Sequence, residues 1–177
     1  MDEKGESENH YGTTSKTAAT PARAFISYSS HDTASAHKVC TALEAAGCPC
    51  WMAPRDVKAG AQYADAIVRA INEARAVVLV LSESAVSSPH IAREIERAAS
   101  KRKPIIPLRL DVAALNPELE YFLSNSQWIE VPKLGFPAAL DKLKEALTQV
   151  SGSSRAAPTT SLRLATRPGS RRNRAAH

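Results

Sequence analysis

Glu94 is the side chain in this sequence whose position best suits chemistry. Residues 89 to 101 predict a helix, and a helical wheel places Ile91, Ile95 and Ala98 on one apolar stripe. Glu94 falls about 60° from Ile91, on the shoulder of that stripe. A carboxylate there is partly desolvated and could stabilise a developing positive charge. From spacing alone, a structural hydrogen bond is the simpler interpretation.

Three other residues differ in what they could contribute to a site. Glu96 lies about 140° from Ile91 and is expected to face water. His90 precedes Glu94 by four residues, so both side chains can point to one side, although a plain surface histidine is the alternative. Trp51 ends a short apolar run and predicts either a half-buried wall or a platform on which a ring stacks.

The segment from Met52 to Gly60 is long for a connection between a strand and a helix. It mixes the charged residues Arg55, Asp56 and Lys58 with apolar ones. Loops of this length often carry function. We expect a surface that contacts another protein or a lid over a charged ligand, and a merely solvated loop remains the alternative.

Strand and helix patterns alternate along the chain and would position these side chains. Asp32 is predicted to cap the first helix and Gly47 to end it. The expected strands are 23–28, 48–51, 76–81, 104–110 and 127–131, and the expected helices are 32–46, 62–74, 89–101, 115–123 and 136–150.

Five strands alternating with helices predict an α/β fold with a parallel sheet covered by helices on both faces. The commonest arrangement is a flavodoxin-like three-layer sandwich with strand order 2-1-3-4-5, whose ligands bind at the carboxyl ends of the strands. That edge would carry Ser29-Ser30-His31 after the first strand and Ser82-Glu83-Ser84 after the third.

Several enzyme classes with related folds are excluded by what these loops lack. The first strand is not followed by G-x-G-x-x-G, and no G-x-x-x-x-G-K-[ST] or strand-borne G-x-S-x-G occurs. A phosphorelay receiver would need an acidic pair after the first strand and an aspartate after the third, where this chain has serines.

The net charge of +5 is unevenly distributed and divides the chain into three parts. Residues 151–177 carry six arginines and no acid, residues 1–22 have a net charge of −2, and residues 23–150 have +1. We expect one folded domain at 23–150 between disordered ends. The arginine-rich tail is expected to be solvated, and contact with a membrane surface, nucleic acid or an acidic partner is the alternative. The tail contains no Phe, Tyr or Trp, so stacking on nucleic-acid bases is not indicated.

The three cysteines, Cys40, Cys48 and Cys50, are expected to be packed thiols in a reducing compartment. The spacing of Cys48 and Cys50 along a strand suits neither a disulfide nor, without histidine partners, a zinc site. The chain shows no signal peptide and no run of about 18 apolar residues, so the expected location is cytoplasmic.

Five motifs, in order and at matching spacing, resemble the bacterial Toll/interleukin-1 receptor (TIR) domains. The resemblance covers residues 23–150. The motifs are Phe25-Ile26-Ser27-Tyr28, the stretch Cys50-Trp51-Met52-Ala53-Pro54-Arg55-Asp56-Val57 leading to Gly60, Val77–Ser82, Ser88-Pro89-His90 with Arg93-Glu94-Ile95-Glu96, and Pro104-Ile105-Ile106-Pro107.

The resemblance implies the same flavodoxin-like fold and, for many bacterial and plant members, cleavage of NAD to nicotinamide and ADP-ribose or a cyclic isomer. It places the catalytic glutamate on Glu94, with NAD as the substrate, no cofactor and no metal. The residues it implies for NAD binding are Ser29, Ser30, Trp51, Ala53, Arg55, Asp56, Ser82 and His90. Glu94 would bind the ribose hydroxyls and stabilise an oxocarbenium-like transition state.

The sequence departs from the family pattern at two places. His90 stands where many NAD-cleaving members have tryptophan, and Ser29-Ser30 stands where some relatives are basic. Two functions therefore stay open. One is an NAD glycohydrolase in bacterial defence or signalling that is activated by self-assembly, and the other is a non-catalytic module that binds other TIR domains through the 52–60 loop.

Overall fold

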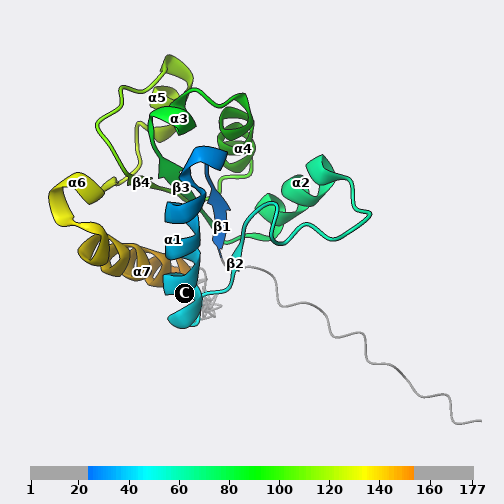
Figure 1. The fold of residues 1–177 in the computed structure, drawn as a ribbon, viewed down its shortest axis with the longest axis horizontal. Coiled ribbons are helices and arrows are strands. Elements are labelled where there is room, and N and C mark those ends of the chain that lie inside the picture. The colour runs from blue at the N-terminus through cyan, green and yellow to red at the C-terminus, as the bar shows by residue number, and fades with distance from the viewer. Residues whose placement is uncertain (1–23, 154–177) are drawn as a thin grey trace, which may run out of the picture.

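The computed structural model describes residues 24–153 and places them in a five-stranded parallel sheet between two layers of helices (Figure 1). The strand order is β2-β1-β3-β4-β5, as predicted from the sequence. The strands are β1 (Ala24–Ser27), β2 (Cys50–Trp51), β3 (Ala76–Leu81), β4 (Ile105–Arg109) and β5 (Ile129–Glu130). The predicted N-terminal segment and nearly all of the arginine-rich tail lie outside the described residues.

Within residues 24–153, eight helical segments connect and cover these strands. They are the 3-10 turn η1 (Ser30–Asp32), α1 (Thr33–Ala45), α2 (Tyr63–Glu73), α3 (Glu83–Val86), α4 (Pro89–Ser100), α5 (Pro117–Leu123), α6 (Val131–Leu134) and α7 (Phe136–Ser153). The short helices α3 and α6 were not predicted, because a four-residue turn has no apolar periodicity to detect. Helix α7 extends three residues past the predicted domain end at 150.

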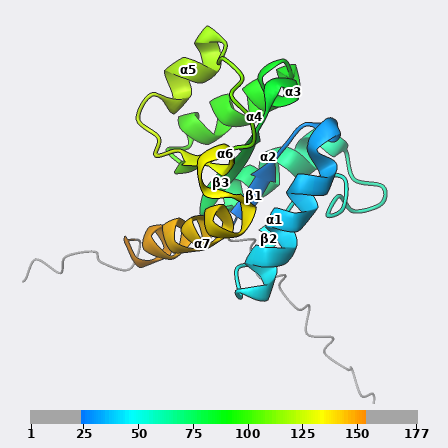
Figure 2. The same ribbon diagram turned by 60° about the vertical axis from the view of Figure 1, so that its left-hand side comes forward.

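The sheet divides the core into two apolar clusters, because successive strand residues point to opposite faces. Ala24 and Ile26 of β1 pack with α1 and α7, whereas Phe25 packs with α2, α4 and α5. Figures 1 and 2 show α1 and α7 together on one side of the sheet. The strand β3 is buried along its whole length, which fits its unbroken apolar run.

The entry to α1 differs from the prediction. Asp32 lies at the helix start but caps no backbone N–H; its carboxylate instead accepts a hydrogen bond from the hydroxyl of Ser82, fifty residues away. The other end is as expected, since Gly47 follows α1 with a φ of 75°, a conformation that glycine adopts without strain.

No helix within the described residues is long and apolar enough to cross a membrane.

Truncating a buried side chain of the central strand β3 should destabilise the domain far more than truncating an exposed side chain. Leu79 of β3 is fully buried, whereas 84% of the Val112 surface is exposed. We expect Leu79→Ala to lower the free energy of unfolding by about 2–5 kcal/mol, because it leaves a cavity between the sheet and α4. Val112→Ala is the control and should change it by less than about 0.5 kcal/mol. Denaturant unfolding followed by circular dichroism measures both, and equal effects would contradict this packing.

Candidate active site

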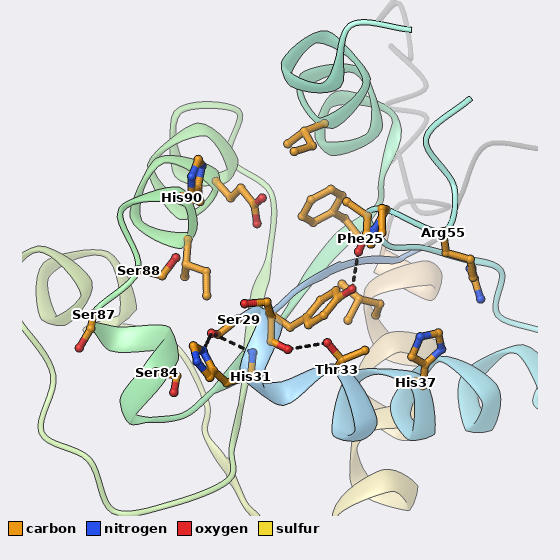
Figure 3. A pocket seen from close by; sticks show the side chains of 18 of the residues that line it. Phe25, Ser29, His31, Thr33, His37, Arg55, Ser84, Ser87, Ser88 and His90 are labelled. Carbon is orange, nitrogen blue, oxygen red and sulfur yellow. Dashed lines mark hydrogen bonds between the residues drawn. The ribbon is translucent and has the colours of Figure 1, made fainter. Parts of the chain in front are cut away.

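A cavity of about 1110 Å³ opens at the carboxyl ends of β1 and β3 (Figure 3). Its volume exceeds the roughly 300–1,000 Å³ of typical small-ligand pockets, so it can hold a dinucleotide. Its wall is built by β1 and the turn that follows it, the start of α1, the β2–α2 loop, and helices α2, α3 and α4. The polar and aromatic residues that line it are Phe25, Tyr28, Ser29, Ser30, His31, Thr33, His37, Arg55, Tyr63, Glu83, Ser84, Ser87, Ser88, His90 and Glu94.

Glu94 lies on this wall because α4 packs its apolar stripe against the sheet. Ile91 and Ile95 are buried in the cluster with Phe25, Glu94 is half-buried, and Glu96 is exposed. The helical wheel predicted this difference between the two glutamates, and the burial pattern confirms it. Helix α4 therefore presents Glu94 to the cavity from the edge of its buried face.

The Glu94 carboxylate is desolvated and has one strong hydrogen bond. Burial raises its pKa from 4.5 to about 7, and the hydrogen bond from Ser27 acts in the opposite direction. That bond joins the Ser27 hydroxyl to Oε2 over 2.6 Å. No lysine or arginine of residues 24–153 forms an ion pair with Glu94. The sequence left the direction of this shift open, and the structure shows that burial outweighs the hydrogen bond.

The two serines after β1 line the cavity in different environments. Ser29 is buried, and its hydroxyl accepts a hydrogen bond from the backbone N–H of His31 at 3.4 Å. Ser30 is exposed, and its carbonyl accepts from the Thr33 hydroxyl at 2.6 Å. His90 lines the opposite wall and is exposed (Figure 3).

Arg55 lines the cavity, but its guanidinium is bound to residues outside the cavity wall. It donates to Glu44 Oε1 at 2.9 Å, to Asp56 Oδ2 at 2.8 Å and to the carbonyl of Cys50 at 3.1 Å. These carboxylates raise the pKa of Arg55 further above its ordinary value. In Figure 3 its side chain points away from the wall that carries His90. The positive charge is therefore turned toward α1 and away from Glu94.

Ala53 lies at the cavity beside Arg55, and the structure fixes its position through Tyr28. The Tyr28 hydroxyl donates to the Ala53 carbonyl, and burial, Tyr63 and Glu94 raise the tyrosine pKa. This bond ties the start of the 52–60 loop to the end of β1. The loop consequently forms one side of the cavity.

Three residues predicted at the site lie behind the cavity wall. Trp51 stacks on Phe25, with ring centroids 5.2 Å apart and planes 13° apart, so that Phe25 lines the cavity in its place. Asp56 turns inward, where it accepts from the Met52 N–H at 2.9 Å. Ser82 is buried and accepts from the Ala85 N–H at 3.1 Å, which caps α3. Each of the three side chains is held by a stacking contact or a hydrogen bond that the sequence spacing does not reveal.

Several cavity residues were missed at the sequence level. His37 and Tyr63 come from the start of α1 and α2, and Ser87 and Ser88 from the turn before α4. Nothing in the local pattern marks His37, Tyr63 or Ser87, and Ser88 was noted only as part of the motif before α4. The rule that ligands bind at the carboxyl edge of the sheet did find the loops containing His31 and Ser84.

No cluster of three or more histidine, cysteine, aspartate or glutamate side chains suited to a metal ion occurs within residues 24–153. Cys40, Cys48 and Cys50 form no disulfide within residues 24–153, and Cys40 and Cys50 are buried. Arg55 donates to the Cys40 sulfur at 3.0 Å, which places this thiol under the 52–60 loop.

Comparison with protein families identifies the fold. Residues 24–144 match the family model of the TIR domain, and the chain belongs to that family. No curated protein matches the chain.

Two solved structures illustrate the similarity. The TIR domain of the Toll-related receptor TRR-2 from Hydra magnipapillata is 20% identical with a TM-score of 0.63, over 72% of this chain and 98% of that one. A TIR-STING receptor from C. gigas, solved with 2',3'-cGAMP, is 26% identical with a TM-score of 0.57, over 71% of this chain and 39% of that one.

Replacing Glu94 by its uncharged isostere should stabilise the domain above neutral pH. The folded-state pKa of about 7 exceeds the ordinary 4.5, so between these values the folded protein binds a proton that the unfolded chain releases. Stability from this group is therefore present below pH 4.5 and is lost as the pH rises to 7. We expect Glu94→Gln to raise the free energy of unfolding by about 1–2 kcal/mol at pH 8 and to change it little at pH 4.

Glu96→Gln, on the exposed face of the same helix, is the matched control. Thermal unfolding at pH 4, 6 and 8 measures all three proteins. A Glu94→Gln variant that is equally affected at every pH would show that the carboxylate is not desolvated in the folded state.

Proposed function

We propose that this TIR domain cleaves NAD at the bond between nicotinamide and ribose, with Glu94 as the catalytic carboxylate. The observation that carries the proposal is a desolvated glutamate on the wall of a dinucleotide-sized cavity, at the sheet edge where α/β proteins bind ligands. The family match supports it, because the motif resemblance places the catalytic glutamate of NAD-cleaving members on the same residue.

The proposed reaction needs little more than charge stabilisation. The C1′–N bond breaks, its electron pair goes to the nicotinamide ring, and neutral nicotinamide leaves. The ribose acquires oxocarbenium character, which a nearby carboxylate stabilises more strongly than it stabilises the substrate. Water then attacks C1′ and gives ADP-ribose and a proton, while attack by a ring nitrogen of the adenine would give a cyclic isomer.

The other cavity residues suggest how NAD would be oriented. The hydroxyls of Ser29 and Ser30 and the imidazole of His90 can bind ribose or phosphate oxygens. Arg55 could pair with a phosphate only by releasing Glu44 and Asp56, and loop movement would have to accompany that release. Trp51, Asp56 and Ser82 would act on NAD only through the residues that they support. We propose defence or signalling as the setting of this activity.

Nicotinamide release by the full-length protein at high concentration tests the proposal. We expect Glu94→Ala and Glu94→Gln to lower turnover by about 100-fold or more, because each removes the charge that stabilises the transition state. Glu96→Gln should retain wild-type turnover, since Glu96 faces solvent. Wild-type turnover in Glu94→Ala would contradict the assigned role.

A binding role without catalysis is the second candidate, and one surface feature favours it. Residues 58–65 are eight consecutive exposed positions, and they continue from the cavity wall at Arg55. An exposed loop beside a cavity can meet the cavity of another copy. The catalytic proposal includes this contact as the means of activation.

Dilution separates the two roles. If assembly activates catalysis, nicotinamide released per protein molecule rises with protein concentration. If the domain is only a binding module, self-association measured by light scattering should occur with no nicotinamide release at any concentration. Turnover per molecule that stays constant on dilution would contradict activation by assembly.

A further inference from the structure

Ser27 is a buried polar residue that takes no direct part in the proposed reaction. It ends β1, and only 1% of its surface is exposed. In a strand, residues two apart point to the same face. Ser27 therefore shares the face of Phe25, which packs in the apolar cluster with Ile91 and Ile95 of α4. A hydroxyl at such a position requires a partner, and its partner is Glu94.

The bond between them has the length expected of a hydroxyl that donates to an ionised carboxylate. The Ser27 oxygen lies 2.6 Å from Glu94 Oε2, and charge-assisted O–H···O⁻ bonds span about 2.5–2.7 Å. It joins β1 to α4 across 67 positions of sequence. The other oxygen, Oε1, has no hydrogen-bond partner among residues 24–153, and Glu94 lines the cavity.

The two oxygens of Glu94 are thus in different environments. Oε2 accepts a hydrogen bond from Ser27, whose short side chain has one rotatable bond and belongs to a buried strand. This leaves Oε1 to face a substrate. Since Ser27 is absent from the cavity wall, it acts on a substrate only through Glu94.

We propose that Ser27 is the positioning residue of the site: it holds Glu94 by one oxygen so that the other is presented to the ribose of the substrate. The inference rests on the proposed NAD-cleaving function. The hydrogen bond also opposes the effect of burial on the Glu94 pKa, so it maintains the ionised form near neutral pH.

The pH profile of turnover distinguishes this role from a merely structural one. In the wild type we expect kcat to rise with pH through an acid limb near pH 7, as Glu94 ionises. Ser27→Ala removes the only hydrogen bond that Oε2 receives from residues 24–153, so the acid limb should move up by about one pH unit and turnover at pH 6 should be about tenfold below that of the wild type. Turnover should recover substantially at pH 9, and KM should change less than about twofold.

Two variants control this comparison. Ser27→Thr retains the hydroxyl and suits a strand, so its acid limb should lie close to that of the wild type. Ser124→Ala removes an exposed hydroxyl at the C-terminal end of α5, one that donates to the carbonyl of Tyr121 and is absent from the cavity wall, and should leave the profile unchanged. A Ser27→Ala profile that is lowered equally at every pH would overturn the proposal.

A readout that does not depend on turnover separates this inference from the proposed function. The carboxyl ¹³C resonance of Glu94, assigned by its loss in Glu94→Gln, gives the titration midpoint directly. We expect the midpoint to be higher in Ser27→Ala than in the wild type. An unmoved midpoint in a protein that cleaves NAD would overturn the role of Ser27 alone, whereas absence of turnover in every variant would overturn the proposed function and the positioning role with it.

Discussion

The desolvation of one carboxylate is the constraint on which this site depends. Glu94 lies where burial raises its pKa to about 7, with a single hydroxyl to compensate. A charge in that position is less stable than it would be in water. An arrangement that lowers folding stability and faces a cavity is typical of functional sites, because the unsatisfied charge can interact with a ligand.

The fold produces this constraint through ordinary packing. Helix α4 buries Ile91, Ile95 and Ala98 against the sheet, and this fixes the rotation of the helix about its axis. Glu94 then has to lie at the edge of the buried face, directly over the end of β1. The 52–60 loop closes the neighbouring side, tied to β1 by the Tyr28 hydroxyl and to α1 by Arg55. The cavity is therefore defined by contacts between segments that are remote in sequence.

The burial of β3 and the rotation of α4 were predictable because each depends on a local apolar pattern, whereas the strand order followed from the commonest arrangement of five strands alternating with helices. The buried run of β3 and the stripe of α4 can be read residue by residue, and both were confirmed. Pairings between distant residues could not be predicted. The stacking of Trp51 on Phe25 and the bond from Ser82 to Asp32 follow only from the assembled sheet. For the same reason, the sequence showed a basic loop residue in Arg55 but not the carboxylates that bind it.

A crystal structure of Glu94→Gln with NAD bound tests the central claim most directly. This variant keeps the shape of residue 94 and should trap the uncleaved substrate. The account predicts the nicotinamide ribose within hydrogen-bond distance of the residue 94 side chain, with the dinucleotide lying along the cavity past Ser29 and Ser30. NAD bound with its ribose remote from residue 94, or a cavity that stays empty at saturating NAD, would contradict it.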